Sequence, residues 1–136
     1  MFAPADELMP IRASDDVVRV RQNVRQRAAA VGLSIVDQTK FVTAASELAR
    51  NTLEYGGGGT ALVQTIADGA RRGVRVTFED QGPGIADIEL ALKDGFTSGG
   101  GLGLGLGGAR RLCNEFDIVS TVGRGTRVTI ARWKLA

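Results

Sequence analysis

The sequence has no histidine and a single cysteine, Cys113. Histidine and cysteine are the ligands on which most protein zinc sites depend, so this composition excludes such a site. One cysteine cannot form an internal disulfide, which is typical of a protein in a reducing, cytoplasmic compartment. We expect Cys113 to lie on a helix that packs into the core, because free cysteines are commonly buried.

The sequence also lacks a hydrophobic run long enough to cross a membrane, and it lacks a strong charge of one sign. The net charge is only +2 and charged residues make up 24% of the chain. The pairs Arg71-Arg72 and Arg110-Arg111 are typical of a solvated surface. The N-terminus carries Asp6 and Glu7 where a signal peptide would be basic and then apolar. We therefore expect no nucleic-acid partner and no membrane partner.

Proline is scarce, at three residues, whereas glycine is abundant, at 19 of the 136 residues. The length and the uniform composition predict a single domain over residues 1–136. The most informative part is the segment Glu79–Gly84, followed by a glycine-rich run over residues 99–108. An acid at the end of an apolar strand, followed by glycines that let the backbone approach a ligand closely, indicates a nucleotide pocket.

Hydrophobic periodicity and turn residues predict a two-layer α/β (α+β) sandwich, with a mostly antiparallel sheet covered by helices on one face. The predicted strands are Leu8–Ala13, with Pro10 at an edge, Thr60–Ala67, Gly73–Asp80, Phe116–Val122 and Thr126–Lys134. The predicted helices run from an N-cap at Ser14 to Gly32, from a capping box at Ser34 and Asp37 to Leu53, from Asp87 to Lys93, and from Leu106 to Glu115.

Three kinds of glycine-rich pocket compete for this sequence. Gly103, Gly105 and Gly108 match the dinucleotide fingerprint, but no strand directly precedes them and no acid near position 125 could hold a ribose. A Walker phosphate loop ends in Gly-Lys-Ser/Thr, whereas this run ends in Gly-Gly-Ala. In the third kind, an aspartate at the end of a strand accepts a hydrogen bond from an adenine amino group. Flexible glycines and the N-terminus of the next helix then bind the phosphates. Asp80 and residues 99–108 supply these parts in that order.

Four motifs then carry a resemblance to a known family. They are Glu47-Leu48-Ala49-Arg50-Asn51, Asp80-Gln81-Gly82-Pro83-Gly84, Gly101-Leu102-Gly103-Leu104-Gly105-Leu106-Gly107 and Gly125-Thr126. In this order they resemble the N box, the G1 box, the G2 box and the last adenine contact of the GHKL ATPase superfamily of gyrase, heat-shock chaperone ATPases, histidine kinases and MutL. The resemblance covers about residue 8 to about residue 134. It implies the Bergerat ATP-binding fold, a mixed sheet with helices on one face.

Within the superfamily, the chain most closely resembles the switch serine/threonine kinases of the RsbT type, which act in the stressosome. The segments that carry this resemblance are Ser46–Asn51, Glu79–Ile85, Asp94–Phe96 and Arg111–Phe116. The resemblance implies ATP and Mg²⁺ as cofactors and a STAS-domain protein as the phosphate acceptor. It also implies that the kinase, once released, binds and activates a PP2C-type phosphatase.

Glu47 and Asn51 are four residues apart on a predicted helix, so they project from one face and can line one pocket. Mg²⁺ takes oxygen ligands and keeps several waters, so the Asn51 amide oxygen and nucleotide phosphates are a sufficient set. The resemblance gives Glu47 the role of catalytic base. The alternative is structural: Glu47 pairs with Arg50 or Arg27, and Asn51 only interrupts the helix pattern.

The predicted nucleotide contacts extend over both glycine motifs. The resemblance assigns Asp80 to the adenine amino group and Thr126 to a water that reinforces that contact, whereas the alternative reads Asp80 and the glycines near it as turn residues. A short glycine-rich lid between Phe96 and Gly103 would close over the phosphates. The full predicted set is Asn51, Asp80, Gly82, Gly84, Ile85, Thr97, Ser98, Gly101, Leu102, Gly103, Leu104, Gly105 and Thr126.

The absence of histidine excludes autophosphorylation on histidine, and 136 residues leave no room for a transducer domain of the gyrase kind. We therefore expect a kinase that phosphorylates Ser or Thr on a small partner protein. Two alternatives remain. One is a non-catalytic switch in which nucleotide only sets a binding conformation. The other is an anti-sigma factor kinase of the SpoIIAB or RsbW type that binds a sigma factor directly. The residues of the segment Asp80–Ile85 resemble those of the switch kinases and argue against this alternative.

Overall fold

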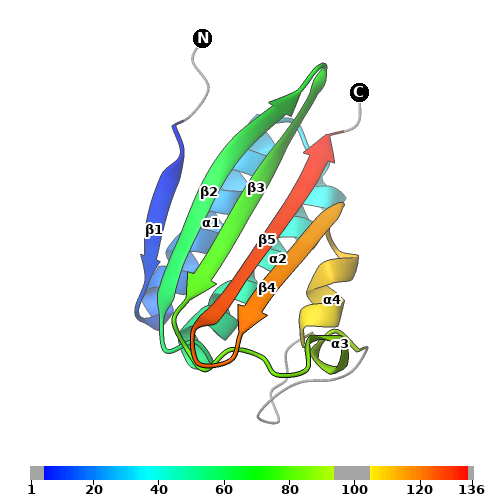
Figure 1. Ribbon diagram of the computed structural model, residues 1–136. Helices are drawn as coiled ribbons and strands as arrows, with labels where there is room; N and C mark the ends of the chain where they lie inside the picture. Colours follow the sequence, from blue (N-terminus) through cyan, green and yellow to red (C-terminus); the bar gives the residue numbers. More distant parts are fainter. Residues whose placement is uncertain (1–4, 94–104, 135–136) are drawn as a thin grey trace.

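Five strands form one sheet in the order β1-β2-β3-β5-β4 (Figure 1). The structure is a computed structural model that describes residues 5–93 and 105–134. Its strands are β1 (Glu7–Ile11), β2 (Gly59–Asp68), β3 (Arg71–Asp80), β4 (Glu115–Thr121) and β5 (Gly125–Lys134). Its helices are α1 (Ser14–Ala30), α2 (Ile35–Glu54), α3 (Ile88–Ala91) and α4 (Gly105–Arg111).

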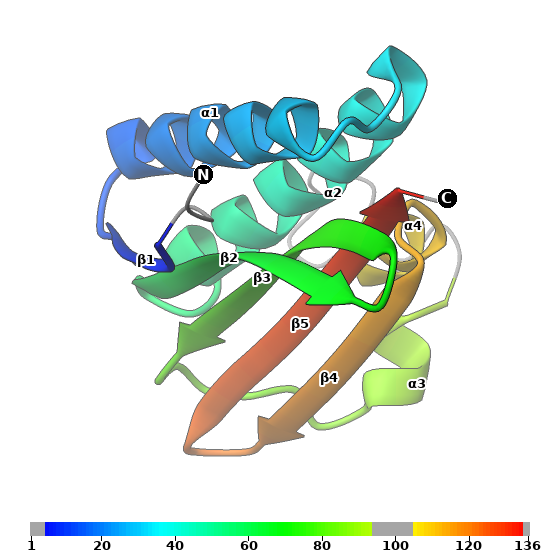
Figure 2. The same ribbon diagram turned by 90° about the horizontal axis from the view of Figure 1, so that it is seen from above.

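The helices α1 and α2 cover one face of the sheet, and α4 packs beside α2 (Figure 2). The opposite face carries no helix from the described residues. This arrangement confirms the predicted two-layer sandwich with helices on one face. Every strand pairing among the described residues is antiparallel, so the sheet is more uniform than the mixed sheet we expected. For β1 and β2 the reason is the α1–α2 hairpin, which crosses the sheet twice and returns the chain to the end where β1 stops.

The core lies between the sheet and the two long helices. Alternate residues of the central strands point toward the helices and are buried, as period-two patterning requires. The largest fully buried side chains are Phe41, Phe78, Ile11, Leu48, Ile130, Val20, Val24, Val63, Val74 and Val76. Because α2 contributes Phe41 and Leu48 to this core, its orientation about its own axis is fixed by packing.

The helix starts follow side-chain capping. Ser34 caps α2 as predicted, since its Oγ accepts a hydrogen bond from the Asp37 amide at 3.1 Å. The predicted Ser14 cap of α1 is wrong, because Ser14 is the first helical residue and Ala13 occupies the N-cap position. Asp16 takes over the capping role, since its carboxylate accepts from the Arg12 and Ala13 amides at 2.8 and 3.2 Å. A carboxylate in the first turn also suits the helix dipole.

The remaining elements are close to their predicted positions but differ at their ends. The β2–β3 hairpin turns over two residues, Gly69 and Ala70, which is tighter than the five-residue loop predicted. The helix α4 ends at Arg111 and not at Glu115, because the Asn114 amide already pairs with the Ala131 carbonyl of β5. Cys113 therefore lies just beyond α4, where burial raises the pKa of its thiol to about 12.

The strand β1 is held to α1 by a buried arginine. Arg27 is only 5% exposed, and its guanidinium donates to the Glu7 carboxylate at 3.1 Å and to Thr65 at 3.2 Å. It also donates to the Asn23 side chain and to the Ala5 carbonyl. A buried charge is stable only when its donors are satisfied, and here partners surround it. The pairing of Glu47 with Arg27 that the sequence offered as an alternative does not occur.

None of the helices in the described residues is sufficiently long and apolar to traverse a membrane.

Candidate functional site

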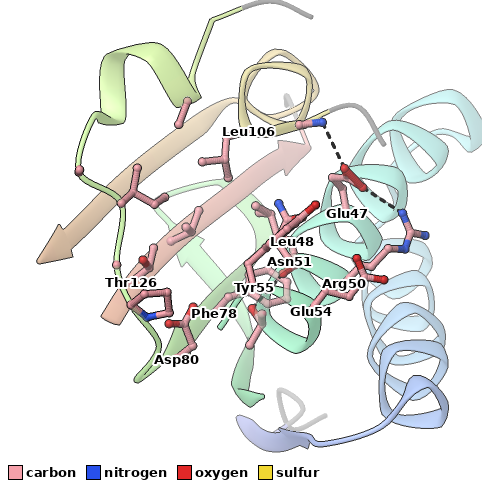
Figure 3. A pocket seen from close by; sticks show the side chains of 18 of the residues that line it. Glu47, Leu48, Arg50, Asn51, Glu54, Tyr55, Phe78, Asp80, Leu106 and Thr126 are labelled. Carbon is pink, nitrogen blue, oxygen red and sulfur yellow. Dashed lines mark hydrogen bonds and ion pairs between the residues drawn. The ribbon is translucent and has the colours of Figure 1, made fainter. Parts of the chain in front are cut away.

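A cavity of about 700 Å³ opens where the C-terminal half of α2 meets the ends of β3 and β5 (Figure 3). Its other walls are the segment after β3, the helix α3 and the start of α4. Predicted site residues that line it are Glu47, Asn51, Asp80, Gly84, Ile85, Gly105 and Thr126. Residues separated by up to about eighty positions in sequence therefore meet around one space.

The α2 wall presents Glu47 on the turn before Asn51. Leu48 and Thr52 are buried on the same helix, and this packing turns Glu47 and Asn51 toward the cavity. The Glu47 side chain is nearly buried, with 6% of the residue exposed. Its Oε1 accepts from the Gly105 amide at 3.1 Å, and its Oε2 accepts from the Arg50 guanidinium at 3.0 Å (Figure 3). Both carboxylate oxygens are thus held in place, and Glu47 still lines the cavity.

The ion pair with Arg50 is the one that the sequence offered as a structural alternative for Glu47. It is present, but it does not remove Glu47 from the cavity, because both residues line it. Arg50 remains 47% exposed, so its guanidinium reaches the carboxylate from the solvent side. From the sequence, Arg50 was included in the N-box motif but was not predicted to contact the site. The spacing of three residues between Glu47 and Arg50 on one helix could have indicated this contact.

Asn51 lines the cavity, and within the described residues its side-chain amide has no hydrogen-bond partner. The described residues contain no cluster of three or more acidic, cysteine or histidine ligands. A bound metal would therefore depend on Asn51 and on a ligand's own oxygens. An amide oxygen with phosphate and water oxygens is a donor set that Mg²⁺ accepts, so the chemistry of the site fits this ion.

Asp80 and Thr126 form the opposite edge of the cavity. They are cross-strand partners in the β3–β5 register, so the pairing itself brings their side chains together. The Asp80 Oδ1 atom accepts from the Gly82 amide at 2.9 Å. Gly82 thereby holds the carboxylate, and a Cβ at Gly82 would lie 2.8 Å from the Gly56 backbone. Gly82 is needed for the close approach of two turns.

Two glycines at this edge adopt conformations that other residues rarely tolerate. Gly84 has φ +77° and Gly125 has φ +124°, both in the region that favours glycine. A Cβ on Gly84 would lie 2.4 Å from the Thr121 carbonyl, and one on Gly125 would lie 2.1 Å from the Asp80 carbonyl. These glycines therefore let the turn after β3 and the start of β5 close around Asp80.

The sequence reasoning missed Ser120 on β4. Its Oγ accepts from the Ile85 amide at 2.7 Å and lies 2.7 Å from the Thr126 hydroxyl. The available signal was its position, because Phe116 and Ile118 precede it at period two on the inward side of β4. A polar residue at an inward position needs hydrogen-bond partners, and Ser120 finds them at the edge of the cavity.

The sequence reasoning also missed most of the apolar wall. Of the apolar side chains in this wall, the sequence assigned only Ile85 to the pocket, because apolar residues there follow the same periodicity as the core. The other apolar residues that line the cavity are Leu48, Phe78, Pro83, Ala86, Leu90, Ala91, Leu106 and Val128. A flat, apolar ligand group fits such a wall, with the polar groups at its two ends.

Six of the predicted site residues lie outside the described residues. They are Thr97, Ser98, Gly101, Leu102, Gly103 and Leu104. The proposed lid between Phe96 and Gly103 lies in the same interval.

Comparisons with known proteins identify the family. The profile of the family described as histidine kinase-, DNA gyrase B-, and HSP90-like ATPase matches residues 36–136. The chain is 44% identical to the serine/threonine-protein kinase RsbT of Bacillus subtilis over 118 residues, which are 87% of this chain and 89% of that protein.

Solved structures show the same fold at low identity. The RsbU and RsbW domains of a Mycobacterium tuberculosis protein superpose with a TM-score of 0.66 at 22% identity, over 98% of this chain and 34% of that one. This chain thus spans about a third of that solved chain. The mycobacterial sensor histidine kinase MprB superposes with a TM-score of 0.55 at 18% identity, over 94% of this chain and 97% of that one. The chain is therefore an ATP-using member of the histidine kinase-, DNA gyrase B- and HSP90-like ATPase family, and within it belongs with the RsbT-type serine/threonine-protein kinases.

Proposed function

We propose that residues 1–136 act as one cytoplasmic kinase domain that transfers phosphate from ATP to a serine or threonine of a STAS-domain protein in a partner-switching pathway. The single observation that carries this proposal is the common cavity of Glu47 and Asn51 at one edge and Asp80 and Thr126 at the other. The 44% identity to a serine/threonine-protein kinase supports the choice of acceptor group. On release from this substrate, the kinase binds and activates a PP2C-type phosphatase.

The nucleotide lies across the cavity in this proposal. Asp80 accepts a hydrogen bond from the adenine amino group, and Thr126 reinforces that contact. The residues Gly82, Gly84 and Ile85 shape the adenine side, while Thr97, Ser98 and residues 101–105 surround the phosphates. Asn51 would hold Mg²⁺ through its amide oxygen, and the ion when bound neutralises the charge of the phosphates.

Glu47 is the catalytic base in this proposal. Each carboxylate oxygen has a second lone pair, so Glu47 can accept the proton of an attacking hydroxyl while Arg50 and Gly105 still hold it. Phosphoryl transfer depends mainly on positioning and charge, so a carboxylate with a fixed orientation suits the reaction. Hydrogen bonds from two sides fix the orientation of the Glu47 carboxylate at the wall of the cavity.

The first experiment is a calorimetric titration of Mg-ADP into the wild type and into Asp80→Asn. One Asp80 oxygen is already used by Gly82, so the variant turns an amide NH₂ toward the ligand, and binding is lost or strongly weakened. The matched control is Asp117→Asn, an exposed acid on β4 outside the cavity, which should bind Mg-ADP as the wild type does. Absence of wild-type binding would contradict the proposed pocket.

The second experiment incubates the kinase and Mg-ATP with purified STAS-domain proteins and measures the intact mass of each acceptor. One added phosphate on a serine or threonine is the expected result. Nucleotide binding without transfer to any acceptor would favour the non-catalytic switch. Nucleotide-dependent complex formation with a sigma factor would favour the anti-sigma factor kinase.

A further inference from the structure

Ser120 connects three groups at the Asp80 edge of the cavity. Its Oγ lies 2.7 Å from the Ile85 amide nitrogen, 3.2 Å from the Gly125 carbonyl oxygen and 2.7 Å from the Thr126 hydroxyl. Ile85 and Thr126 both line the cavity. Ser120 therefore ties the turn after β3 to the start of β5 through one atom.

The number of available hydrogens fixes the direction of each hydrogen bond. The Ile85 N–H donates, and the Gly125 carbonyl can only accept, so the single Ser120 hydrogen goes to Gly125. The contact between Ser120 and Thr126 must then use the Thr126 hydrogen. This is the one assignment that satisfies all three contacts of Ser120. Thr126 consequently turns its hydrogen away from the cavity and offers the cavity only lone pairs.

The neighbouring group on this edge is also an acceptor. The Asp80 carboxylate carries no hydrogen when ionised, and its Oδ1 already accepts from Gly82. Asp80 and Thr126 are cross-strand partners, so their acceptor atoms face the same part of the cavity. An edge made only of acceptors favours a ligand edge that donates. A 6-amino purine donates there, whereas a 6-oxo purine presents a further acceptor.

We propose that Ser120 is a specificity-determining residue, which selects adenine over 6-oxo purines by holding the Thr126 hydroxyl as an acceptor. This inference rests on the proposed function, since it requires the base to lie against Asp80 and Thr126. Ser120 itself need not touch the nucleotide, because it acts through the orientation of one hydroxyl. Without Ser120, the Thr126 hydroxyl is free to rotate and donate to an oxo group.

The test measures the affinities of Mg-ADP and Mg-IDP by calorimetry, because the two bases differ at the 6-position and the adjacent ring nitrogen. In Ser120→Ala we expect the ratio of the IDP to the ADP dissociation constant to fall about tenfold, the size of one hydrogen-bond difference. Ser120→Thr keeps the hydroxyl on a β-branched side chain that suits a strand, and should keep the wild-type ratio. Thr129→Ala, on the other face of β5, is the matched control and should also keep it.

A second variant keeps the test decisive if Ser120→Ala does not fold, which circular dichroism would reveal. Ser120→Cys is close in size but is a weak donor and a weak acceptor, so it should lower the ratio in the same direction. Thr126→Val removes the acceptor itself, and adding Ser120→Ala to it should change the ratio no further. Equal weakening of both nucleotides by Ser120→Ala or Ser120→Cys would overturn the inference. A wild type that binds neither nucleotide would overturn the proposed function with it.

Discussion

The two edges of the cavity are built in different ways. The strand edge, which comprises Asp80, Ile85, Ser120 and Thr126, is fixed by backbone register and by hydrogen bonds among three strands and a turn. The helix edge, which comprises Glu47, Asn51 and Gly105, depends on the packing of α2 and on one bond to the seven-residue helix α4. A register slip moves a strand by a whole residue and reverses its faces, whereas a packed helix can shift by only about 1–2 Å.

This difference separates binding from chemistry. We expect changes at the strand edge to alter nucleotide affinity or the stability of the sheet, and changes at the helix edge to alter the rate of transfer.

Glu47→Gln tests the helix edge directly. The amide keeps the size of the side chain but is a poor proton acceptor, so we expect kcat to fall about 100- to 10,000-fold while the Mg-ADP dissociation constant changes little. Phosphate incorporation into the acceptor and calorimetry measure the two quantities. Glu89→Gln, an exposed acid on α3, is the control. Equal transfer rates in the variant and the wild type would remove Glu47 from the mechanism.

Gly125→Ala tests the strand edge. Its Cβ would lie 2.1 Å from the Asp80 carbonyl at φ +124°, so we expect the free energy of unfolding to fall by about 3 kcal/mol, with loss of Mg-ADP binding. Gly123→Ala is the matched control, because φ is +81° there but nothing lies within 4 Å. It should cost only about 1 kcal/mol. Chemical denaturation measures the free energy of unfolding of both variants. Equal decreases in the two variants would mean that the close contact at Gly125 is unimportant.

Arg50→Ala removes a side chain that holds Glu47 at the helix edge. The guanidinium holds one Glu47 oxygen at 3.0 Å, so we expect kcat to fall about tenfold, or ~1.4 kcal/mol in the barrier, with KM for ATP unchanged. Arg50→Lys should recover part of the rate because a charged donor remains. Arg25→Ala, an exposed arginine on α1, should have the wild-type rate. A change confined to KM would instead assign Arg50 to nucleotide binding.

Glu7→Gln changes a residue outside the cavity and should have only a minor effect. Hydrogen bonds from Asn23 and then Arg27 hold the pKa of the Glu7 carboxyl below its ordinary value of 4.5. Because the folded-state pKa is depressed, Glu7 stabilises the fold above the unfolded-state pKa, and this contribution is lost as pH falls through the folded-state pKa. The Tm of the variant should therefore fall less than the Tm of the wild type when the pH is lowered below about 4.5. Parallel Tm curves would contradict this, and Mg-ADP affinity should not change.

Most of the fold could be predicted from the sequence, because hydrophobic periodicity and turn residues indicate the same strands and helices along most of the chain. The Ser34 cap and the start of β5 near Thr126 were predicted closely, since each depends on local chemistry. The cap of α1 was not predicted correctly. Ser14 and Asp16 both suit the start of a helix, and only the geometry of the preceding turn decides between them. The five-residue β2–β3 loop was wrong because strand pairing extended to Asp68 and Arg71.

The site was predictable where a motif carries its residues and not elsewhere. Glu47, Asn51, Asp80 and Thr126 belong to motifs, and the structure gathers them around one cavity. Ser120 belongs to no motif, and its partners at Ile85 and Thr126 depend on a strand pairing that local patterns do not specify. The roles of these residues stay predictions until the variants above are measured.

The register of β5 has a consequence for inserting extra residues into this chain. Asp80 faces Thr126 only because β3 and β5 pair in one register, and a slip of one residue would turn Thr126 to the uncovered face of the sheet. The β4–β5 turn is further tied by the Gly123 amide to the Pro83 carbonyl at 2.9 Å. The β2–β3 turn at Gly69 and Ala70 is exposed and lies at the other end of β3. A reporter peptide inserted there should leave nucleotide recognition intact, whereas the same insertion between Thr121 and Gly125 should abolish it.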